Sequence, residues 1–327
     1  MNGQLPFETL DRTLLSRSQV KITKGFPNRS AEELLKSGII CLNKPAGPNS
    51  HQVADYLKSI LKLKRAGQTG TLDPAVYGVL PVVLENATRI ADALLPAGKE
   101  YVALMYVHDD FAEEVIRKEL EEFIGTITQL PPMKSAVKRE LREREIYYID
   151  VLEIDGRYVL FRMGCQGGTY VRKYIHDFGK KLNAGAHMKE LVRTKAGPFS
   201  FTDMCTLHDV KDAFVAYEEG KPSKLKKLIF PIEKAVEHLP KVFVHDSAIK
   251  NICNGSPLYV GGVEKVEQCV SKDSLVAMMS TKNELIGLGK AKCSPEEMVR
   301  ASKGVAVLTE KVFYREDAGS RSEQKAR

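Results

Sequence analysis

Residues 65–89 read RAGQTGTLDPAVYGVLPVVLENATR, a glycine-rich first half followed by an apolar second half. Gly67 and Gly70 permit backbone conformations that are closed to other residues. Pro74 restricts Asp73 to an extended or turn conformation, so we expect the backbone to hold the Asp73 carboxylate in place. A fixed, solitary carboxylate in such a loop is suited to act as a nucleophile or a general base. The alternative is an ordinary turn, which an Asp-Pro pair also favours.

The composition is that of a globular chain with a modest excess of positive charge. Its 327 residues are enough for one large domain and a smaller one. The 49 Lys and Arg residues outnumber 42 Asp and Glu residues, giving a formal net charge of +7, which permits a polyanionic partner without identifying one. No apolar run approaches the roughly 18–20 residues of a membrane span, so we predict no membrane association.

Cysteine and histidine are scattered along the chain. The six cysteines include no CxxC pair, and the seven histidines include no HExxH arrangement. This pattern argues against a zinc site and a disulfide framework, and it is typical of proteins in a reducing compartment. We therefore predict a cytoplasmic protein without a bound metal ion.

Stretches on either side of residues 65–89 have the patterns of regular structure. Residues 38–43 form a short apolar run bounded by turn residues, which indicates a buried strand. Ser50 is suited to cap the helix that follows. Residues 99–107 and 158–165 are rich in β-forming residues and predict two further strands.

A second helix is predicted after residues 167–169, because apolar residues there recur at helical spacing. Arg172 lies beside this apolar stripe rather than opposite it, so it can point into a cleft at the start of the helix. Residues 187–199 form another strand-like run that contains a Gly-Pro stop.

Two basic stretches allow two interpretations each. Residues 134–144 carry five cations against two acids, and the segment 131–144 is too long for a tight hairpin, so we expect an exposed loop. Such a loop either contacts phosphates or is simply solvated. Four cations between Lys58 and Arg65 either stabilise the end of a helix or guide a nucleic-acid backbone toward the Asp73 loop.

Changes in composition predict four segments. Residues 1–35 are polar and are expected to form a partly ordered arm. A first, larger domain is expected over 36–240, with a polar linker in its last part, residues 218–240. Residues 241–316 contain short β-rich pieces separated by turns, which predict a small barrel or sandwich. Residues 317–327 are expected to be a disordered tail.

Six stretches together resemble one known protein family. They read GIICLNKPAGPNSHQV, RAGQTGTLDPAVYGVLPVVLENATR, KEYVALMYV, PPMKSAVKRELRERE, GGTYVRKYIHDFG and GAHMKELVRTKAGPF. In this order they resemble the TruB/dyskerin pseudouridine synthases, most closely the archaeal, guide-RNA-dependent branch (the centromere-binding factor five type). The resemblance implies an α/β (α+β) catalytic domain with a mixed, largely antiparallel sheet. It also implies that residues 241–316 form a small β-barrel PUA domain, on which the N-terminal arm can pack.

The resemblance assigns catalytic roles to three residues. Asp73 matches the nucleophile that attacks the target uridine, through the ribose C1′ or through the base, after which the uracil is detached, turned and rejoined through carbon. Tyr101 matches the tyrosine that stacks on the base and takes part in proton removal, although a tyrosine in a strand is otherwise typical of a core position. Arg172 matches the arginine that pairs with the aspartate, which would keep Asp73 ionised in a largely apolar site. Leu191 matches a leucine of the pocket wall.

Other positions match residues that support the site or contact RNA. Lys44 and Pro45 match a motif that supports the active-site loop, and Lys44 is also assigned to the substrate-binding set. Gln68 occupies the position of a family histidine that contacts flipped bases, so we expect less efficient unaided base flipping. The basic segment 133–144 matches the thumb loop that closes over substrate RNA. Its expected substrate contacts are Lys134, Lys138 and Arg139.

The resemblance implies an RNA pseudouridine synthase without a cofactor, acting on rRNA and possibly the tRNA T-arm. In the main interpretation the chain is the catalytic subunit of an H/ACA ribonucleoprotein, where a guide RNA pairs with the target and the PUA domain binds the guide. Expected partners are a small zinc-ribbon protein, a glycine/arginine-rich-type β-barrel protein and a kink-turn-binding ribosomal-type protein. The alternatives are a stand-alone tRNA T-arm synthase and a non-catalytic RNA-binding scaffold.

Overall fold

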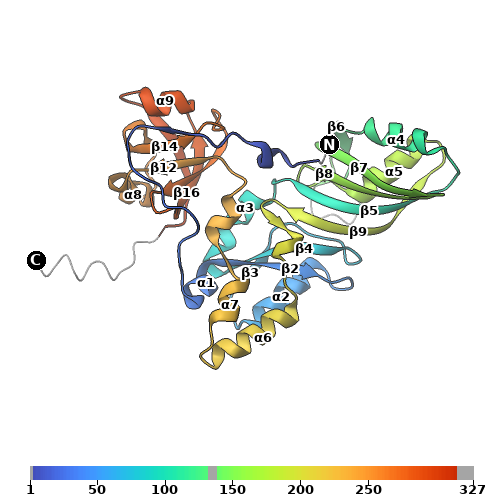
Figure 1. Cartoon of the computed structure of the whole chain (residues 1–327), viewed down its shortest axis with the longest axis horizontal. Coiled ribbons are helices and arrows are strands. Elements are labelled where there is room, and N and C mark those ends of the chain that lie inside the picture. Colours follow the sequence, from blue (N-terminus) through green and yellow to red (C-terminus); the bar gives the residue numbers. More distant parts are fainter. Residues whose placement is uncertain (1–2, 132–137, 315–327) are drawn as a thin grey trace, which may run out of the picture. The chain divides into compact units, whose positions relative to one another are not determined.

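The computed structural model describes residues 3–131 and 138–314, and its elements are labelled in Figure 1. The chain divides into two compact units. The first unit contains Arg29–His238 together with the beginning of the chain up to Thr9. The second contains Leu10–Asn28 together with the chain from Leu239 onward. The expected arm over residues 1–35 is therefore divided: its middle belongs to the second unit and its two ends to the first.

A ten-stranded sheet forms the base of the first unit. Its strands follow the order β11-β2-β4-β9-β5-β8-β7-β6, with β3 paired to β4 and β10 paired to β9. The pairing of β4 with β9 is parallel and the other pairs are antiparallel, which confirms the expected mixed, largely antiparallel sheet. The strands are β2 (Gly38–Lys44), β3 (Ala66–Gln68), β4 (Tyr77–Leu84), β5 (Lys99–Val107), β6 (Gly125–Gln129), β7 (Arg142–Asp155), β8 (Tyr158–Cys165), β9 (Ala186–Ala196), β10 (Phe199–Ser200) and β11 (Phe230–Pro231).

Helices cover this sheet in two groups, each with its own apolar core. Helices α1, α2, α6 and α7 pack beside β2 and β4, and α4 and α5 pack on the part of the sheet that contains β5, β8 and β9 (Figure 1). The α-helices are α1 (Ala31–Ser37), α2 (Ser50–Ile60), α3 (Ala91–Leu94), α4 (Glu113–Glu121), α5 (Val171–Lys181), α6 (Leu207–Glu218) and α7 (Ser223–Leu228). The short 3-10 helices are η1 (Pro6–Thr9), η2 (Glu85–Ile90), η3 (Phe201–Asp203) and η4 (Ile232–Val236).

Three local predictions differ from the structure. Asn49, not Ser50, caps α2, because the Asn49 side chain accepts from the Gln52 N–H in a capping box. The expected basic loop ends early, since Arg142 already begins β7. The expected linker over 218–240 contains α7, β11 and η4, because Leu225 is buried beneath the polar and basic surface of α7.

The second unit is a seven-stranded sheet around one apolar core. Its strands follow the order β1-β14-β12-β15-β16-β17-β13, with β12 and β15 parallel. The strands are β1 (Leu14–Ser16), β12 (Lys241–Val244), β13 (Leu258–Tyr259), β14 (Val263–Glu267), β15 (Leu275–Ser280), β16 (Leu285–Ala291) and β17 (Val305–Val312). The helices are α8 (Asp246–Cys253), α9 (Pro295–Arg300) and the 3-10 helix η5 (Val260–Gly262).

Residues near the start of the chain form contacts within each unit: one segment contributes to the second unit and another to the first. In the second unit, β1 pairs with β14, and Arg17 donates to the carbonyls of Met298 and Ala301. In the first unit, Leu5 is fully buried, and its N–H donates to the Glu8 carboxylate at 2.7 Å. The tail expected over 317–327 lies outside the described residues.

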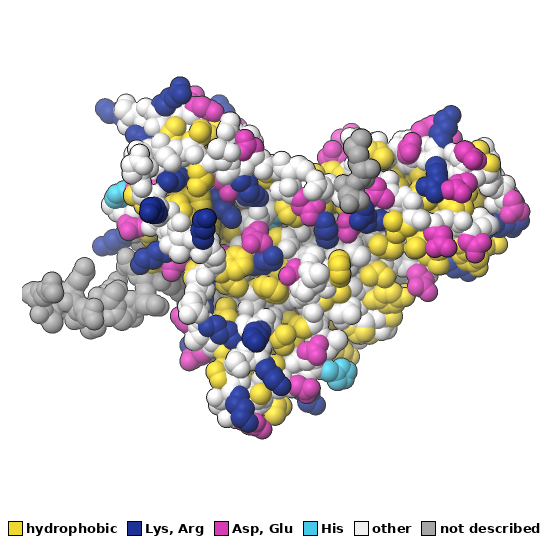
Figure 2. All heavy atoms as spheres, in the orientation of Figure 1, with side chains coloured by type: hydrophobic (Ala, Val, Ile, Leu, Met, Phe, Trp, Pro, Cys, Tyr) yellow, Lys and Arg dark blue, Asp and Glu magenta, His cyan; other side chains and the backbone are white. Residues whose placement is uncertain are grey.

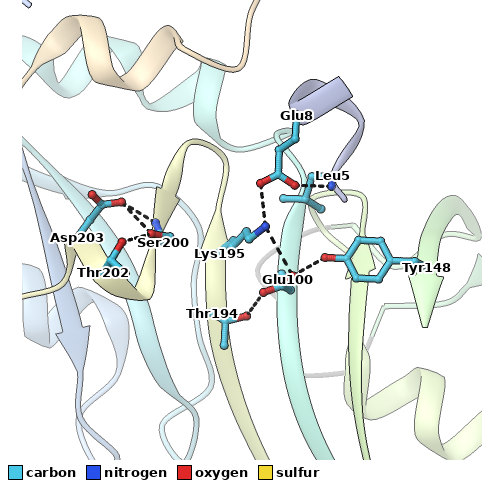
Figure 3. A network of polar contacts seen from close by, with 9 residues as sticks. All are labelled: Leu5, Glu8, Glu100, Tyr148, Thr194, Lys195, Ser200, Thr202 and Asp203. Atoms are coloured by element: carbon cyan, nitrogen blue, oxygen red, sulfur yellow. Dashed lines mark hydrogen bonds and ion pairs between the residues drawn. The ribbon is translucent and has the colours of Figure 1, made fainter. Parts of the chain in front are cut away.

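A polar network lies on one face of β5 in the first unit (Figure 3). The buried carboxylate of Glu100 accepts from the Tyr148 hydroxyl and, at 2.7 Å, from the Thr194 hydroxyl. The Lys195 ammonium lies 3.8 Å from Glu100 and 2.7 Å from Glu8, which joins the N-terminal segment to the sheet. In the described part of the chain, no helix is both long and apolar enough to cross a membrane.

Candidate active site

A cavity of about 430 Å³ opens in the first unit where the Asp73 loop, β5, β9 and the start of α5 meet. Its size is in the range of small-molecule sites and suits a single nucleotide base with part of its sugar. The sequence-predicted residues Asp73, Tyr101, Arg172 and Leu191 all line it. The remaining lining residues are Gly70, Thr71, Leu72, Val76, Leu95, Pro96, Lys99, Gly167, Gly168, Thr169, Tyr170, Val171 and Arg193.

Asp73 is the first residue of a turn held by backbone bonds. The Asp73 carbonyl accepts from the Val76 N–H at 3.0 Å, in a turn where Pro74 follows Asp73. The Ser50 hydroxyl, at the start of α2, accepts from the Leu72 N–H at 2.8 Å and lies 3.2 Å from the Leu72 carbonyl. The backbone before Asp73 is therefore fixed from α2, a role for Ser50 that the sequence did not indicate.

Lys44 lies beneath this turn and does not line the cavity. Its side chain has no exposed surface, and its ammonium donates to the carbonyls of Pro45, Pro74 and Val76 at 2.8, 3.1 and 2.7 Å. These three acceptors use all three donors of the ammonium. Lys44 thus has the geometry of a loop support, and its expected place among the substrate contacts is corrected. Burial, followed by the nearby Arg193, lowers the pKa of Lys44.

Asp73 and Arg172 form an ion pair at the mouth of the cavity. The Arg172 and Asp73 side chains are 53% and 48% exposed, so the pair is in contact with solvent. An ion pair in such a solvated position contributes only about 0–1 kcal/mol to stability. The pair therefore leaves the carboxylate accessible to a substrate while orienting it with a positive charge.

Tyr101 and Leu191 form one wall of the cavity from neighbouring strands. Tyr101 is a buried residue of β5. Leu191 is in β9, opposite Ala103 of β5. Burial raises the pKa of the Tyr101 hydroxyl, and the guanidinium of Arg193 opposes that rise. Tyr101 is thus both a core residue and a residue of the cavity wall, because the cavity borders the apolar core.

Two buried cations at the cavity were not among the sequence-predicted site residues. Arg193 is 1% exposed; its Nε donates to the Val79 carbonyl at 2.7 Å and one terminal nitrogen donates to the Gly70 carbonyl at 3.1 Å. Lys99 donates to the carbonyls of Leu94, Leu95 and Ala97 at 3.1, 3.3 and 2.6 Å. Burial, followed by the charge of Arg193, lowers the pKa of Lys99 to about 7. The available signal was weak: both are cations at inward positions of predicted strands, and period-2 alternation places them beside Leu191 and Tyr101.

Three of the remaining predicted substrate contacts, Gln68, Lys138 and Arg139, do not line the cavity. The side-chain oxygen of Gln68 accepts from the Gly70 N–H, so Gln68 fixes the loop rather than facing the cavity. Lys138 is exposed, 3.2 Å from Glu140, and Arg139 is also exposed. Lys134 lies outside the described residues. Exposed lysines also gather over α7, as Figure 2 shows, at Lys224, Lys226 and Lys227.

The arrangement suits chemistry on a nucleobase in a nucleic acid. An accessible carboxylate can attack carbon or accept a proton, and a neighbouring aromatic ring can stack on a base, which contributes about 1–3 kcal/mol per base. The cavity is too small to admit a duplex, so a target base must be extruded to enter it.

Three family models match the chain in sequence order. The model described as TruB family pseudouridylate synthase (N terminal domain) matches residues 58–114 and 107–171. The tRNA pseudouridylate synthase B C-terminal domain matches residues 172–237, and the PUA domain matches residues 240–313.

Relatives match the chain over nearly its whole length. A protein named probable tRNA pseudouridine synthase B from Pyrococcus abyssi is 52% identical over 90% of this chain and 89% of its own length. A protein of the same name from Methanopyrus kandleri is 48% identical over 95% and 93%. A chain in the crystal structure of a Cbf5-Nop10-Gar1 complex has a TM-score of 0.90 and 48% identity, covering 96% of this chain and 97% of that one. A chain in an H/ACA RNP bound to a substrate RNA containing 2′-deoxyuridine has a TM-score of 0.88 and 46% identity, covering 96% and 98%.

Proposed function

This chain belongs to the TruB family of pseudouridylate synthases, and we propose that it isomerises uridine in RNA as the catalytic subunit of an H/ACA-type, guide-dependent ribonucleoprotein. One observation carries the proposal: Asp73, Tyr101, Arg172 and Leu191, drawn from four separate segments, line a single cavity. The near-complete coverage by chains from Cbf5-Nop10 and H/ACA structures supports the guide-dependent mode.

In the proposed mechanism Asp73 is the nucleophile. Its carboxylate bonds to C1′ while the C1′–N1 bond breaks, and the bonding pair leaves with uracil; attack on the base is the alternative opening step. The uracil turns and C5 bonds to C1′, which releases Asp73 with its electron pair. The proton on C5 is then removed and N1 gains one, so the net change is an isomerisation that consumes no co-reactant. Arg172 orients the carboxylate, and Tyr101 stacks on the ring and takes part in the proton transfer.

The domains and partners follow from the same proposal. Residues 36–240 form the catalytic domain and residues 241–316 the PUA domain that binds guide RNA, with Leu10–Asn28 as part of the second unit. The exposed Lys138 and Arg139 would contact substrate RNA. The proposed protein partners are a zinc-ribbon protein of the Nop10 type, a β-barrel protein of the Gar1 type and a kink-turn-binding protein. The scattered cysteines, which include no CxxC pair, support the reducing cytoplasm as the compartment.

A stand-alone tRNA synthase is the second candidate, because the curated relatives carry the name tRNA pseudouridine synthase B. Tritium release from 5-tritiated uridine in RNA separates the two. The assay uses tRNA alone, then a guide RNA with its target and the three partner proteins. We expect release mainly in the guided assembly. Release on tRNA alone would favour the stand-alone enzyme, and no release in either arm with intact RNA binding would leave a non-catalytic scaffold.

The role of Asp73 is tested in the same assay. Asp73→Asn keeps the size of the side chain but removes its negative charge, so tritium release should be lost. Full activity of Asp73→Asn on a substrate that the wild-type protein modifies would overturn the proposed active site.

A further inference from the structure

Residues 3–9 form a short turn of chain that is docked on the first unit. The Leu5 N–H donates to one oxygen of the Glu8 carboxylate at 2.7 Å, and the Glu8 N–H donates to the Leu5 carbonyl at 2.9 Å. The other oxygen of that carboxylate lies 2.7 Å from the Lys195 ammonium in β9 (Figure 3). These bonds hold the Leu5 side chain in one position, where it has no exposed surface.

Two side chains of this segment reach the connection between α3 and β5. Leu5 covers Gly98, because a β-carbon at residue 98 would lie 3.2 and 3.5 Å from the two terminal methyl carbons of Leu5. The Phe7 ring meets the His238 ring edge-on, with 6.2 Å between the ring centroids. His238 is buried, and its Nε2 donates to the Ala93 carbonyl at 3.0 Å. The segment therefore contacts the last residue of the connection directly, and it contacts α3 through the histidine.

The connection, residues 95–98, forms part of the wall of the active-site cavity. Leu95 and Pro96 line the cavity. The backbone of the connection is packed against Gly167, where a β-carbon would lie 2.3 Å from the Leu95 carbonyl oxygen. Gly167 belongs to the turn that leads into α5, the helix that carries Arg172. A displacement of the connection would therefore move the cavity wall and also the turn before Arg172.

We propose that residues 3–9 are a positioning element of the active site, with Leu5 as the positioning residue that holds the connection in place. This inference rests on the proposed function and adds a segment that lies outside the residues matched by the three family models. Because Leu5 fills the space beside Gly98, the connection cannot relax toward it. The cavity then keeps the shape that holds an extruded uracil beside Asp73. A misplacement of about 1 Å can slow a reaction by about 100-fold, so such support matters for the rate.

Leu225 provides the matched control for a purely structural role. It is another fully buried leucine of the first unit, but it belongs to α7 and to the separate apolar core beside β2 and β4. It does not line the cavity. Replacing either leucine by alanine leaves an apolar void and lowers stability. Only the replacement of Leu5 also removes the contact with Gly98.

The first test compares Leu5→Ala, Leu5→Met and Leu225→Ala on the RNA substrate that the wild-type protein modifies. We expect Leu5→Ala to lower the single-turnover rate constant at saturating RNA at least about tenfold, with RNA affinity within about twofold of wild type. Leu5→Met should stay within about threefold of wild type, because methionine fills a similar volume. Leu225→Ala should stay within about twofold, because its site is independent of the cavity. Equal losses in Leu5→Ala and Leu225→Ala, or a Leu5→Met protein as slow as Leu5→Ala, would overturn the proposal.

The second test measures the cavity wall itself and needs no activity. The chain contains no tryptophan, so Leu95→Trp places a single one in the wall, at a residue that is 45% exposed. Acrylamide quenching of its fluorescence is measured in the full chain. The quenching constant should rise about 1.5-fold or more when Leu5→Ala is added, because the connection loses a packing partner and opens locally. It should stay unchanged when Leu225→Ala is added.

An unchanged quenching constant after addition of Leu5→Ala would overturn the inference whatever the enzyme does. Where Leu5→Ala does not fold, Phe7→Ala takes its place, because the half-buried Phe7 ring acts on the same connection through His238. It should raise the quenching constant and lower the rate constant, and no change in either would overturn the inference. Failure of the proposed function has a different signature: the wild-type protein would release no tritium, while the difference in quenching would remain.

Discussion

Asp73 and Glu100 are two carboxylates of the same unit with opposite surroundings. Asp73 is about half exposed and pairs with one arginine at the mouth of a cavity. Glu100 is buried and accepts from the hydroxyls of Tyr148 and Thr194, with Lys195 nearby. Only the Asp73 carboxylate is accessible to a substrate. Only the Glu100 carboxylate forms hydrogen bonds that are shielded from water and can contribute substantially to the free energy of unfolding. Exposure, rather than the presence of a charged partner, separates the chemical carboxylate from the structural one.

The largest expected effect is on the chemical side of this comparison. Asp73→Asn should lower tritium release by at least about 10⁴-fold, as removal of a nucleophile does elsewhere, with the melting temperature within experimental error of wild type. Asp55→Asn is the matched control, because Asp55 is another exposed carboxylate in an ion pair, 2.7 Å from Lys58, and should keep full activity. A large loss of stability in Asp73→Asn would contradict the distinction between a chemical role for Asp73 and a structural role for Glu100.

Glu100→Ala tests the structural side. The buried hydroxyl of Tyr148 and the half-buried hydroxyl of Thr194 would lose their acceptor, so the free energy of unfolding of the first unit should fall by about 3 kcal/mol. Glu100→Gln keeps an acceptor oxygen and should lose only about 1 kcal/mol. Urea unfolding followed by a probe in the first unit measures both. The activity of the folded fraction should fall less than tenfold; a loss on the scale of Asp73→Asn would make Glu100 a chemical group instead.

The buried Lys99 should make the free energy of unfolding of the first unit depend on pH. Its folded pKa is about 7 against 10.5 for an ordinary lysine, so between these values the unfolded chain binds a proton that the folded chain does not. The unfolding free energy of wild type relative to Lys99→Met should therefore rise with pH from about 7 to 10.5, by up to about 1.4 kcal/mol per pH unit. Below pH 7 the difference should be constant. Parallel stability curves of the two proteins across this range would contradict the shift.

The smallest effect is expected at fully solvated cations. Replacing Lys138 and Arg139 by alanine should leave stability unchanged and reduce the salt dependence of RNA binding by about one to two counterions. Filter binding at several salt concentrations measures that slope. Lys36→Ala is the control, because Lys36 pairs with Glu32 within α1 and has no predicted RNA contact. An equal change in slope in the control would remove the assignment of Lys138 and Arg139 to RNA.

The four cavity residues were predictable through the family motifs rather than through their local chemistry. Asp73, Tyr101, Arg172 and Leu191 come together in the structure as those motifs predicted. The strand predicted over residues 99–107 matches β5, because a run of alternating β-forming residues favours a strand over a helix or a loop.

The missing parts depend on contacts between distant segments. The alternation of the predicted strands places Arg193 and Lys99 at inward positions, but only the folded backbone supplies the carbonyls to which these buried cations donate. The basic stretch after residue 218 concealed α7, whose single buried leucine, Leu225, gives too weak an apolar pattern to predict a helix. The extent of burial around Asp73 could not be read from its neighbours either, because the cavity mouth is formed by α5.

Strand β1 has a consequence for the order in which the protein is made. Leu14 is synthesised long before its partner Glu267 in β14. The segment that contains β1 must therefore wait until β14 has been made, and a pairing over such a sequence distance closes slowly. Until it closes, the β14 edge presents unpaired backbone groups, the feature that allows strands of different molecules to associate. Variants that lack residues 10–28 would carry that open edge permanently, and we expect them to aggregate.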